Sequence, residues 1–485
     1  MLFNSATYIF VFVPLVAAGY FTLNHFTRYR LAAIFLAIAS LVFYSIEGFD
    51  FLPVLLLSIV ANYAMGTALT ISPETMEGPR KTLLTVGIMF NLGMLAYFKY
   101  TNFFLDNVDA LLGTDWKIEK VAFPLALSFV TFQKIAYLVD SYRSLTRGYG
   151  AVNYGLFVTF FPQLIAGPIV HHADLVPQFK NKERRQFNFE NASLGLMIFS
   201  AGLFKKVVLA DTFSQWSTPG FDAATNLTSL QAWITGLSFT FQLYFDFSGY
   251  VDMAIGSALI FNIHLPINFN SPYSSTNIQD FWRRWHMTLS RFLRDYLYIP
   301  LGGNRRGELR TYANLFATFL LGGLWHGASW MFVIWGALHG AGLVIHRVWN
   351  RSGLPLPRPV AWLVTFVFVV ITWVFFRATN MESAMKILTG MANFQDGSMQ
   401  ALYQQIREQP FILRDYLSMD SQLFSLTWLS AAFIIVLVFP TSMRLFKGKQ
   451  RKVPYALYAG ALFAAALLPL LSLQESPSEF LYFNF

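Results

Sequence analysis

The sequence predicts an all-helical protein that crosses a membrane many times. Of its residues, 55% are hydrophobic and only 13% are charged, whereas an ordinary soluble domain carries about 25% charged residues. Apolar runs recur almost from one end of the chain to the other. A bilayer offers no water to backbone polar groups, so runs of this kind form helices. We therefore expect an all-α polytopic membrane protein with about 11–12 transmembrane helices.

The candidate spans follow one another along residues 1–485 as a single predicted membrane domain, because no block typical of a soluble domain separates them. No basic segment precedes the first run, so we expect it to remain as a helix and not to be cleaved as a signal peptide. The expected spans are residues 6–23, 31–46, 51–70, 82–98, 121–139, 191–210, 229–262, 311–325, 328–348, 360–378, 427–443 and 455–472.

One apolar segment does not fit a simple crossing. Residues 154–170, YGLFVTFFPQLIAGPIV, contain Pro162, Gly167 and Pro168 and have basic loops on both sides. A re-entrant segment that enters and leaves by the cytoplasmic face satisfies both facts. Irregular backbone at membrane depth is tolerated only where protein or a water-filled cavity covers it. The chain is therefore expected to enclose a cavity.

The net charge of +9 first suggests a nucleic-acid partner. The lysines and arginines, however, cluster in loops between apolar runs, as the positive-inside rule requires. The orientation of the helices in the membrane therefore explains the positive net charge, and no nucleic-acid partner is expected. Residues 283–310 belong to the cytoplasmic set, and the more acidic segment 380–426 is expected outside. The chain has no cysteine, which excludes disulfides, thiolate nucleophiles and cysteine-metal sites.

Common catalytic signatures are absent from the chain. The sequence contains no G-x-x-x-x-G-K-[ST], no H-E-x-x-H and no G-x-S-x-G, which removes the usual arguments for a nucleotide-driven pump, a zinc protease or a hydrolase. The H-x4-D pattern of soluble acyltransferases is missing too, and no metal site is expected. The remaining candidates are histidines and a carboxylate inside apolar sequence.

The segment FWRRWHMTLSRFLRDYL, residues 281–297, is predicted to be one basic amphipathic helix. Apolar side chains fill one arc, arginines fill the other, and His286 falls inside the apolar arc. Such a helix usually lies at a membrane surface with its apolar face toward lipid or protein. His286 is then either a second, cytoplasm-facing member of a catalytic site or a packed core residue.

His326 lies in LWHGASW, between a short apolar run and a longer one. The short run has about 13 residues against the roughly 20 needed to cross a bilayer, so the two runs predict a hairpin that turns within the membrane. An ionisable residue at depth is a functional candidate by default. Imidazole can take a proton from an attacking hydroxyl or accept an acyl group. The alternative is an imidazole bonded to backbone where Gly327 breaks the helix, and Trp325 is a further site candidate.

His339 would lie roughly 20 Å from His326 along a continuous helix, so the two can share a small site only if the helix is broken between them. We interpret His339 as structural. Gln242 and Asp246 lie one helical turn apart on one face. This carboxylate can relay protons, bind a cation or pair with a loop arginine. The remaining histidines, which are expected to be solvated, are His25, His171, His172, His264 and His346.

Four motifs resemble the membrane-bound O-acyltransferase family, most closely its bacterial exopolysaccharide branch that acetylates alginate. They are FPQLIAGPIV at 161–170, YFDFSGYVDMAIG at 244–256, FWRRWHMTLSRFLRDYLYIPLGGNR at 281–305 and WHG at 325–327. PLALSFVTFQKIAYLVDSYR at 124–143 and the terminal FLYFNF are similar to that branch as well. The resemblance implies a membrane funnel with a thin floor, an essential His326 and an important His286.

The resemblance implies an O-acetyltransferase of the bacterial inner membrane, with acetyl-CoA as a cytoplasmic donor substrate and no permanently bound cofactor. Basic side chains of the inner loops would hold the coenzyme phosphates. The expected partners are a polysaccharide acceptor, of alginate or cellulose type, and a periplasmic serine-hydrolase-like acetyltransferase. The expected coenzyme-binding residues are Arg283, Arg284, Arg305 and Arg306.

Two other functions remain open. A related branch of the family transfers D-alanine to teichoic acids. A transporter or polymer-export channel would instead place Asp246 and the histidines along a path, although the chain shows no duplicated half of the kind common in transporters.

Overall fold

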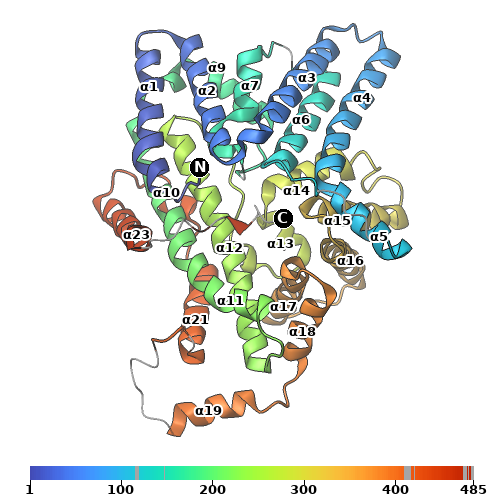
Figure 1. The fold of residues 1–485 in the computed structure, drawn as a ribbon, viewed down its shortest axis with the longest axis vertical. Helices are drawn as coiled ribbons and strands as arrows, with labels where there is room; N and C mark the ends of the chain where they lie inside the picture. The colour runs from blue at the N-terminus through green and yellow to red at the C-terminus, as the bar shows by residue number, and fades with distance from the viewer. Residues whose placement is uncertain are drawn as a thin grey trace. The chain divides into compact units, whose positions relative to one another are not determined.

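The computed structural model describes residues 1–114, 120–146, 148–165, 167–408, 417–419, 421–472, 478 and 480–481. Every regular element in this part of the chain is a helix, and it contains no strand (Figure 1). The all-α prediction is therefore confirmed. The FLYFNF motif from position 482 onward lies outside the described residues, as do residues 409–416 and 420 of the predicted outer segment.

The chain divides into two compact units. The first consists of Met1–Leu203, Tyr250–Ile267 and Phe446–Phe483, and the second contains Phe204–Gly249 and Asn268–Leu445. The prediction of one domain over residues 1–485 stays a prediction.

The helices of the first unit are η1 (Tyr8–Phe12), α1 (Val13–His25), α2 (Tyr29–Gly48), η2 (Phe49–Phe51), α3 (Leu52–Ile71), α4 (Glu77–Leu95), η3 (Ala96–Tyr100), α5 (Thr101–Leu112), α6 (Leu127–Tyr142), α7 (Ala151–Thr159), α8 (Phe161–Leu164), α9 (His172–Lys180), η4 (Glu183–Arg185), α10 (Phe189–Phe204), which ends at the boundary, and α23 (Val453–Ser472). The second unit carries η5 (Lys205–Ala210), α11 (Asp211–Asp222), α12 (Ser229–Ile260) as far as Gly249, η6 (Pro272–Ser274), α13 (Ile278–Arg284), α14 (Met287–Leu293), η7 (Arg294–Tyr298), α15 (Glu308–His326), α16 (Trp330–Ser352), α17 (Arg358–Arg377), α18 (Met381–Ala392), α19 (Ser398–Glu408), α21 (Gln422–Val438) and most of α22 (Ser442–Phe446).

Seven helical stretches of the described chain are long and apolar enough to cross a bilayer. One of them, Tyr29–Ile71, contains two predicted spans in a continuous helical run. Every predicted span overlaps a helix, but α6 and α21 have only 16 and 17 residues. The protein is a multi-pass membrane protein. The seven stretches are Tyr8–His25, Tyr29–Ile71, Glu77–Leu112, Phe189–Asp222, Trp330–Ser352, Arg358–Arg377 and Val453–Leu470.

The segment predicted to be re-entrant is two short helices and not one span. α7 ends at Thr159, and α8 starts at Phe161 with Pro162 in its first turn. The Oγ atom of Ser40 accepts a hydrogen bond from the Phe161 N–H at 3.1 Å. The break is buried in protein and its backbone is satisfied there, as irregular backbone in a membrane protein requires.

The prediction of one continuous helix over residues 281–297 is wrong. The helix breaks between α13 and α14, where His286 adopts a left-handed conformation with φ 44°. Asn268 holds this break from outside the segment: its backbone oxygen accepts from the Met287 N–H at 3.0 Å, and its side-chain oxygen accepts from the Thr288 N–H at 3.1 Å. The apolar period continues across the break, so sequence periodicity alone does not detect it.

α15 and α16 form the predicted hairpin. α15 ends at His326 and α16 begins at Trp330. Glycines bring the two backbones together, since a Cβ on Gly336 would lie 2.5 Å from the Phe319 oxygen and one on Gly323 would lie 2.3 Å from the Phe332 oxygen. Small residues at such crossings are how membrane helices pack closely.

We expect Gly336→Ala to separate the α15–α16 hairpin and to lower stability by about 1–3 kcal/mol, the usual cost of overpacking. Thermal unfolding of the purified protein in detergent measures this change. Gly93→Ala in α4 is the matched control, because a Cβ there would meet nothing within 4 Å. The control should be neutral or stabilising by up to about 1 kcal/mol. Equal effects of the two substitutions would contradict close packing at Gly336.

Candidate functional site

His326 lies at the C-terminal end of α15 with only 4% of its surface exposed. Its ring packs edge-on against Trp335 at 5.0 Å and Phe376 at 5.3 Å between ring centroids. Trp325, the preceding residue, is also buried and its ring lies 4.9 Å from His326. The imidazole is therefore surrounded by aromatic rings, and water has little access to it.

The histidines at 326 and 339 belong to one aromatic cluster, because the hairpin breaks the helix between them. Trp335 contacts both, with its ring 4.6 Å from His339. The Nδ1 atom of His339 accepts a hydrogen bond from the Trp282 indole N–H at 3.1 Å. This bond and complete burial are consistent with the predicted structural role of His339.

His286 is completely buried, at 0% exposure, and its ring packs edge-on against Phe247 at 4.8 Å. Its Nδ1 atom lies 3.2 Å from the side-chain oxygen of Asn268. That oxygen also accepts from the Thr288 N–H, so it is an acceptor, and a neutral His286 must carry its proton on Nδ1. The Nε2 lone pair then has no hydrogen-bond partner within the described part of the chain.

Tryptophans connect the surroundings of the two candidate histidines. Trp285, next to His286, lies 5.0 Å from Trp373, and Trp373 stacks on Trp335 at 5.9 Å. Trp335 in turn contacts His326. The structure therefore places His286 and His326 on one aromatic cluster of the second unit, separated by tryptophans and not in direct ring contact.

Gln242 and Asp246 lie on one face of α12, as predicted, and both face η5 and α11. Asp246 is 1% exposed and forms an ion pair with Lys206 at 2.7 Å, so its basic partner is a helix lysine and not a loop arginine. Lys206 also contacts Asp211 at 3.0 Å. Gln242 accepts a hydrogen bond from the Ser217 hydroxyl at 2.5 Å.

The four predicted coenzyme-binding arginines differ in how they are held. Arg284 is tied to Asp280 at 3.0 Å. Arg283, Arg305 and Arg306 are exposed and form no ion pair within the described residues, so their charges are available to an anion.

The IPLGGNRRG loop is a turn and not a phosphate cradle. Gly302 and Gly303 have positive φ, and their N–H groups donate to Ile299 and Tyr298 within the loop. The N–H groups of these two glycines are therefore not available to an anion, which would meet the arginine side chains of the loop.

One histidine cluster was missed because two of its members were expected to be solvated. His171 and His172 both place Nε2 on the same oxygen of Asp140, at 2.8 and 2.9 Å. His172 is buried, and burial lowers its pKa while the hydrogen bond to Asp140 opposes the shift. Within the described residues, these three side chains are grouped closely enough to hold a metal ion.

Hydrogen bonds already satisfy that cluster. The Nδ1 atom of His171 accepts from the Ala173 N–H at 3.2 Å, which puts the proton of a neutral ring on Nε2, where it donates to Asp140. Tyr149 contacts Nδ1 of His172 at 3.1 Å. Metal binding would require His171 to lose the Ala173 bond, so the geometry favours a structural network that joins the end of α6 to the start of α9.

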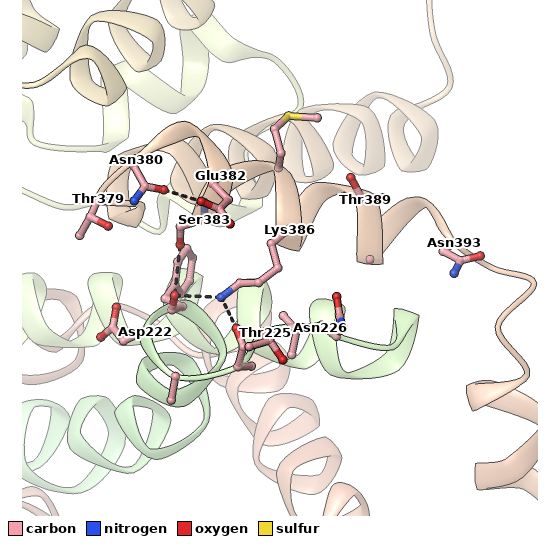
Figure 2. Close-up of a pocket in the computed structure, with 16 residues that line it drawn as sticks. Asp222, Thr225, Asn226, Thr379, Asn380, Glu382, Ser383, Lys386, Thr389 and Asn393 are labelled. Atoms are coloured by element: carbon pink, nitrogen blue, oxygen red, sulfur yellow. Dashed lines mark hydrogen bonds between the residues drawn. The ribbon is translucent and has the colours of Figure 1, made fainter. Parts of the chain in front are cut away.

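A polar pocket in the second unit includes none of the predicted site residues. It lies between the segment 221–227, at the end of α11, and the segment 379–393, which contains α18 (Figure 2). Nothing in the sequence pattern points to it, because its two walls lie far apart in the chain.

Comparison with known proteins identifies the class. Residues 26–385 match the membrane-bound O-acyltransferase family, and the chain belongs to this family. A peptidoglycan O-acetyltransferase of Helicobacter pylori is 44% identical and aligns with 100% of this chain and 98% of its own length. A probable alginate O-acetylase of Azotobacter vinelandii is 40% identical over 83% of this chain and 80% of that protein.

A teichoic acid D-alanyltransferase of Bacillus subtilis is more distant, at 28% identity over 50% of this chain and 66% of that protein. The chain is therefore a membrane-bound O-acyltransferase, and the enzymatic prediction is confirmed. The individual roles of His326, His286 and the arginines stay predictions.

We expect Asp246→Asn to lower stability by up to about 3 kcal/mol, because it removes one of the two carboxylates that pair with the buried Lys206 ammonium and leaves only the partly exposed Asp211. Thermal unfolding measures the loss. The double variant Asp246→Leu with Lys206→Met removes both charges and should recover most of it. If Asp246→Asn unfolds at the wild-type temperature but loses activity, the carboxylate has a chemical role and not the structural one argued here.

Proposed function

We propose that this enzyme transfers acetyl groups from cytoplasmic acetyl-CoA across the bacterial inner membrane to hydroxyl groups of an extracytoplasmic polysaccharide. The observation that carries the proposal is the burial of His326 at the turn of the α15–α16 hairpin, inside the part of the chain that matches the family. The O-acetyltransferase names of the relatives support acetyl as the transferred group.

The proposed chemistry needs a base at the reacting hydroxyl. His326 takes the proton of the hydroxyl as its oxygen attacks the thioester carbonyl, the C–S bond breaks, and the coenzyme leaves as a thiol after protonation. Alternatively, His326 accepts the acetyl group first and passes it to the hydroxyl. In either route the aromatic rings around His326 limit competing hydrolysis by water.

His286 supplies a second imidazole whose Nε2 lone pair has no partner within the described residues. Because Asn268 fixes the proton on Nδ1, Nε2 is the basic nitrogen. We place His286 on the donor side, next to the cytoplasmic arginine segment. The side chains free to hold the coenzyme phosphates are then Arg283, Arg305 and Arg306. Arg284 is already in an ion pair with Asp280.

The acceptor is proposed to be peptidoglycan in preference to alginate. The peptidoglycan O-acetyltransferase aligns over the whole chain, whereas the alginate relative leaves part of it unmatched. A cellulose-type polymer has no support from the named relatives. A periplasmic acetyltransferase partner fits an acceptor that lies outside the membrane.

Two other functions are less favoured. D-alanyl transfer to teichoic acid rests on a relative that covers half of the chain. A transport path lined by Asp246 conflicts with the ion pair that this carboxylate makes with Lys206.

We expect His326→Gln to lower acetyl transfer by about 10²–10⁴-fold, the usual contribution of a general base. Glutamine is chosen because His326 is packed against Trp335 and Phe376, and alanine would leave a cavity there. His346→Gln on α16 is the control and should keep full activity. A His326→Gln protein that retains more than about a tenth of wild-type transfer would exclude a base or acyl carrier at this position.

Reconstituted vesicles test the proposal as a whole. Radiolabelled acetyl-CoA is supplied on one side, and the polysaccharide with its periplasmic partner on the other. Because the chain has no cysteine, a single Asn304→Cys substitution, at an exposed position of the IPLGGNRRG loop, reports orientation and should react only from the donor side. Absence of labelled polymer with every component present, in correctly oriented vesicles, sinks the acetyltransferase proposal.

Asn268→Ala should lower kcat by about 10–100-fold, as for other hydrogen bonds that orient a histidine. Asn268→Asp keeps the acceptor oxygen and should restore much of the rate. Its carboxylate also favours the imidazolium form of His286, which raises the pKa of the base and moves the acidic limb of the pH–rate profile to higher pH. A purely structural Asn268 would change stability in both variants without moving the profile.

A further inference from the structure

The polar pocket at the end of α11 has the dimensions of a ligand site. Its volume is about 910 Å³, near the upper end of the roughly 300–1,000 Å³ range of small-molecule sites. One wall is the segment 221–227, and the other is the segment 379–393, in which α18 presents one face (Figure 2).

Internal hydrogen bonds fix the two walls to each other. The Lys386 ammonium donates to the Phe221 oxygen at 3.1 Å and to the Ala224 oxygen at 2.7 Å. The Ser383 hydroxyl also donates to the Phe221 oxygen, at 3.1 Å. Figure 2 shows these bonds crossing from α18 to the opposite wall. The pocket is thus preformed, which reduces the ordering cost of binding.

Other lining side chains keep their polar ends for a ligand. They bring amide, hydroxyl and carboxylate groups to one concave surface, and their side chains make no hydrogen bond within the part of the chain described here. Groups of this kind bind sugar hydroxyls and acetamido groups by exchange of hydrogen bonds. These side chains are Thr225, Asn226, Glu382, Thr389 and Asn393.

A chain of contacts at the end of α17 links the pocket to His326 within the same unit. The Phe376 ring packs against His326. The next residue, Arg377, forms an ion pair with Asp222 at 2.6 Å, and Asp222 lines the pocket. One end of α17 therefore contacts the candidate catalytic histidine and the pocket wall at successive residues.

The charge of the lining discriminates among polysaccharides. The pocket contains the carboxylates of Asp222 and Glu382, and the ammonium of Lys386, which is already held by carbonyl oxygens. Asp222 is already paired with Arg377, so a polyuronate, with a carboxylate on every sugar, would bring like charge mainly against Glu382, which forms no ion pair within the described residues. A neutral glycan of N-acetylated amino sugars meets no such repulsion and pairs with the free amides.

From these observations we propose that this pocket is the acceptor site and that it binds a glycan strand of N-acetylhexosamines in preference to a polyuronate. The inference rests on the proposed function, because an acceptor site presupposes transfer to a polysaccharide. The first experiment therefore measures glycan binding without any acetyl donor.

The test uses the full chain in detergent, with a β-1,4-linked tetrasaccharide of N-acetylglucosamine and an oligouronate of the same length as probes. The triple variant Asn226→Ala, Thr389→Val, Asn393→Ala changes exposed side chains and should fold normally. Gln400→Ala, an exposed amide on α19 outside the pocket, is the matched control. Wild type and control should bind the tetrasaccharide, the triple variant should bind it at least tenfold more weakly, and the oligouronate should bind more weakly than the tetrasaccharide.

Unchanged tetrasaccharide affinity in the triple variant overturns the proposal, and so does oligouronate binding of equal strength. Absence of tetrasaccharide binding to the wild type also overturns the proposal. The same holds if the pocket binds a periplasmic partner protein and not the tetrasaccharide. In transfer assays the triple variant should raise the acceptor KM without lowering kcat, and His326-dependent turnover of acetyl-CoA should be unchanged. If the wild type binds the tetrasaccharide but shows no turnover of acetyl-CoA, the proposed function is rejected and the glycan site is retained.

Discussion

The scarcity of water inside a bilayer is the constraint on which this structure depends. A polar group placed among apolar helices must find its partner in the protein. Lys206 therefore sits between two aspartates, and the amides of Asn62 and Asn91 bond to each other. The Nε2 atom of His286 is one of several buried side-chain atoms that have no partner within the described residues, and Nε2 of His339 is another. An unpaired basic nitrogen in a buried aromatic setting has a cost that catalysis would explain.

The same constraint accounts for the aromatic cluster. Trp335 contacts His326 on one side and His339 on the other. Rings of this size bury large areas without requiring many polar partners. They also hold the imidazole in a site from which water is largely excluded, and water is the molecule that would destroy an activated acyl group. Under the proposed function, the same aromatic side chains serve both the packing of the core and the chemistry at the candidate catalytic histidines.

Composition and apolar period were sufficient to predict the helices and the α15–α16 hairpin, because these depend on local sequence. The short run before His326 carries that information within a few turns. The break at His286 was not predictable, since it depends on Asn268, 18 residues away. The Asp140–His171–His172 network and the Asp246–Lys206 pair are likewise contacts across more than 30 residues. Single-sequence patterns do not show which distant polar residues meet.

This division between local and distant contacts bears on how the family can change acceptors. The histidine cluster depends on the α15–α16 hairpin and on the α13–α14 break, whose packing leaves little freedom to change. The pocket depends on exposed polar side chains of α18 and of the segment after α11. Substitutions at such positions usually alter stability by little, so under the proposal that the pocket binds the acceptor, acceptor preference could change while the histidine cluster is retained.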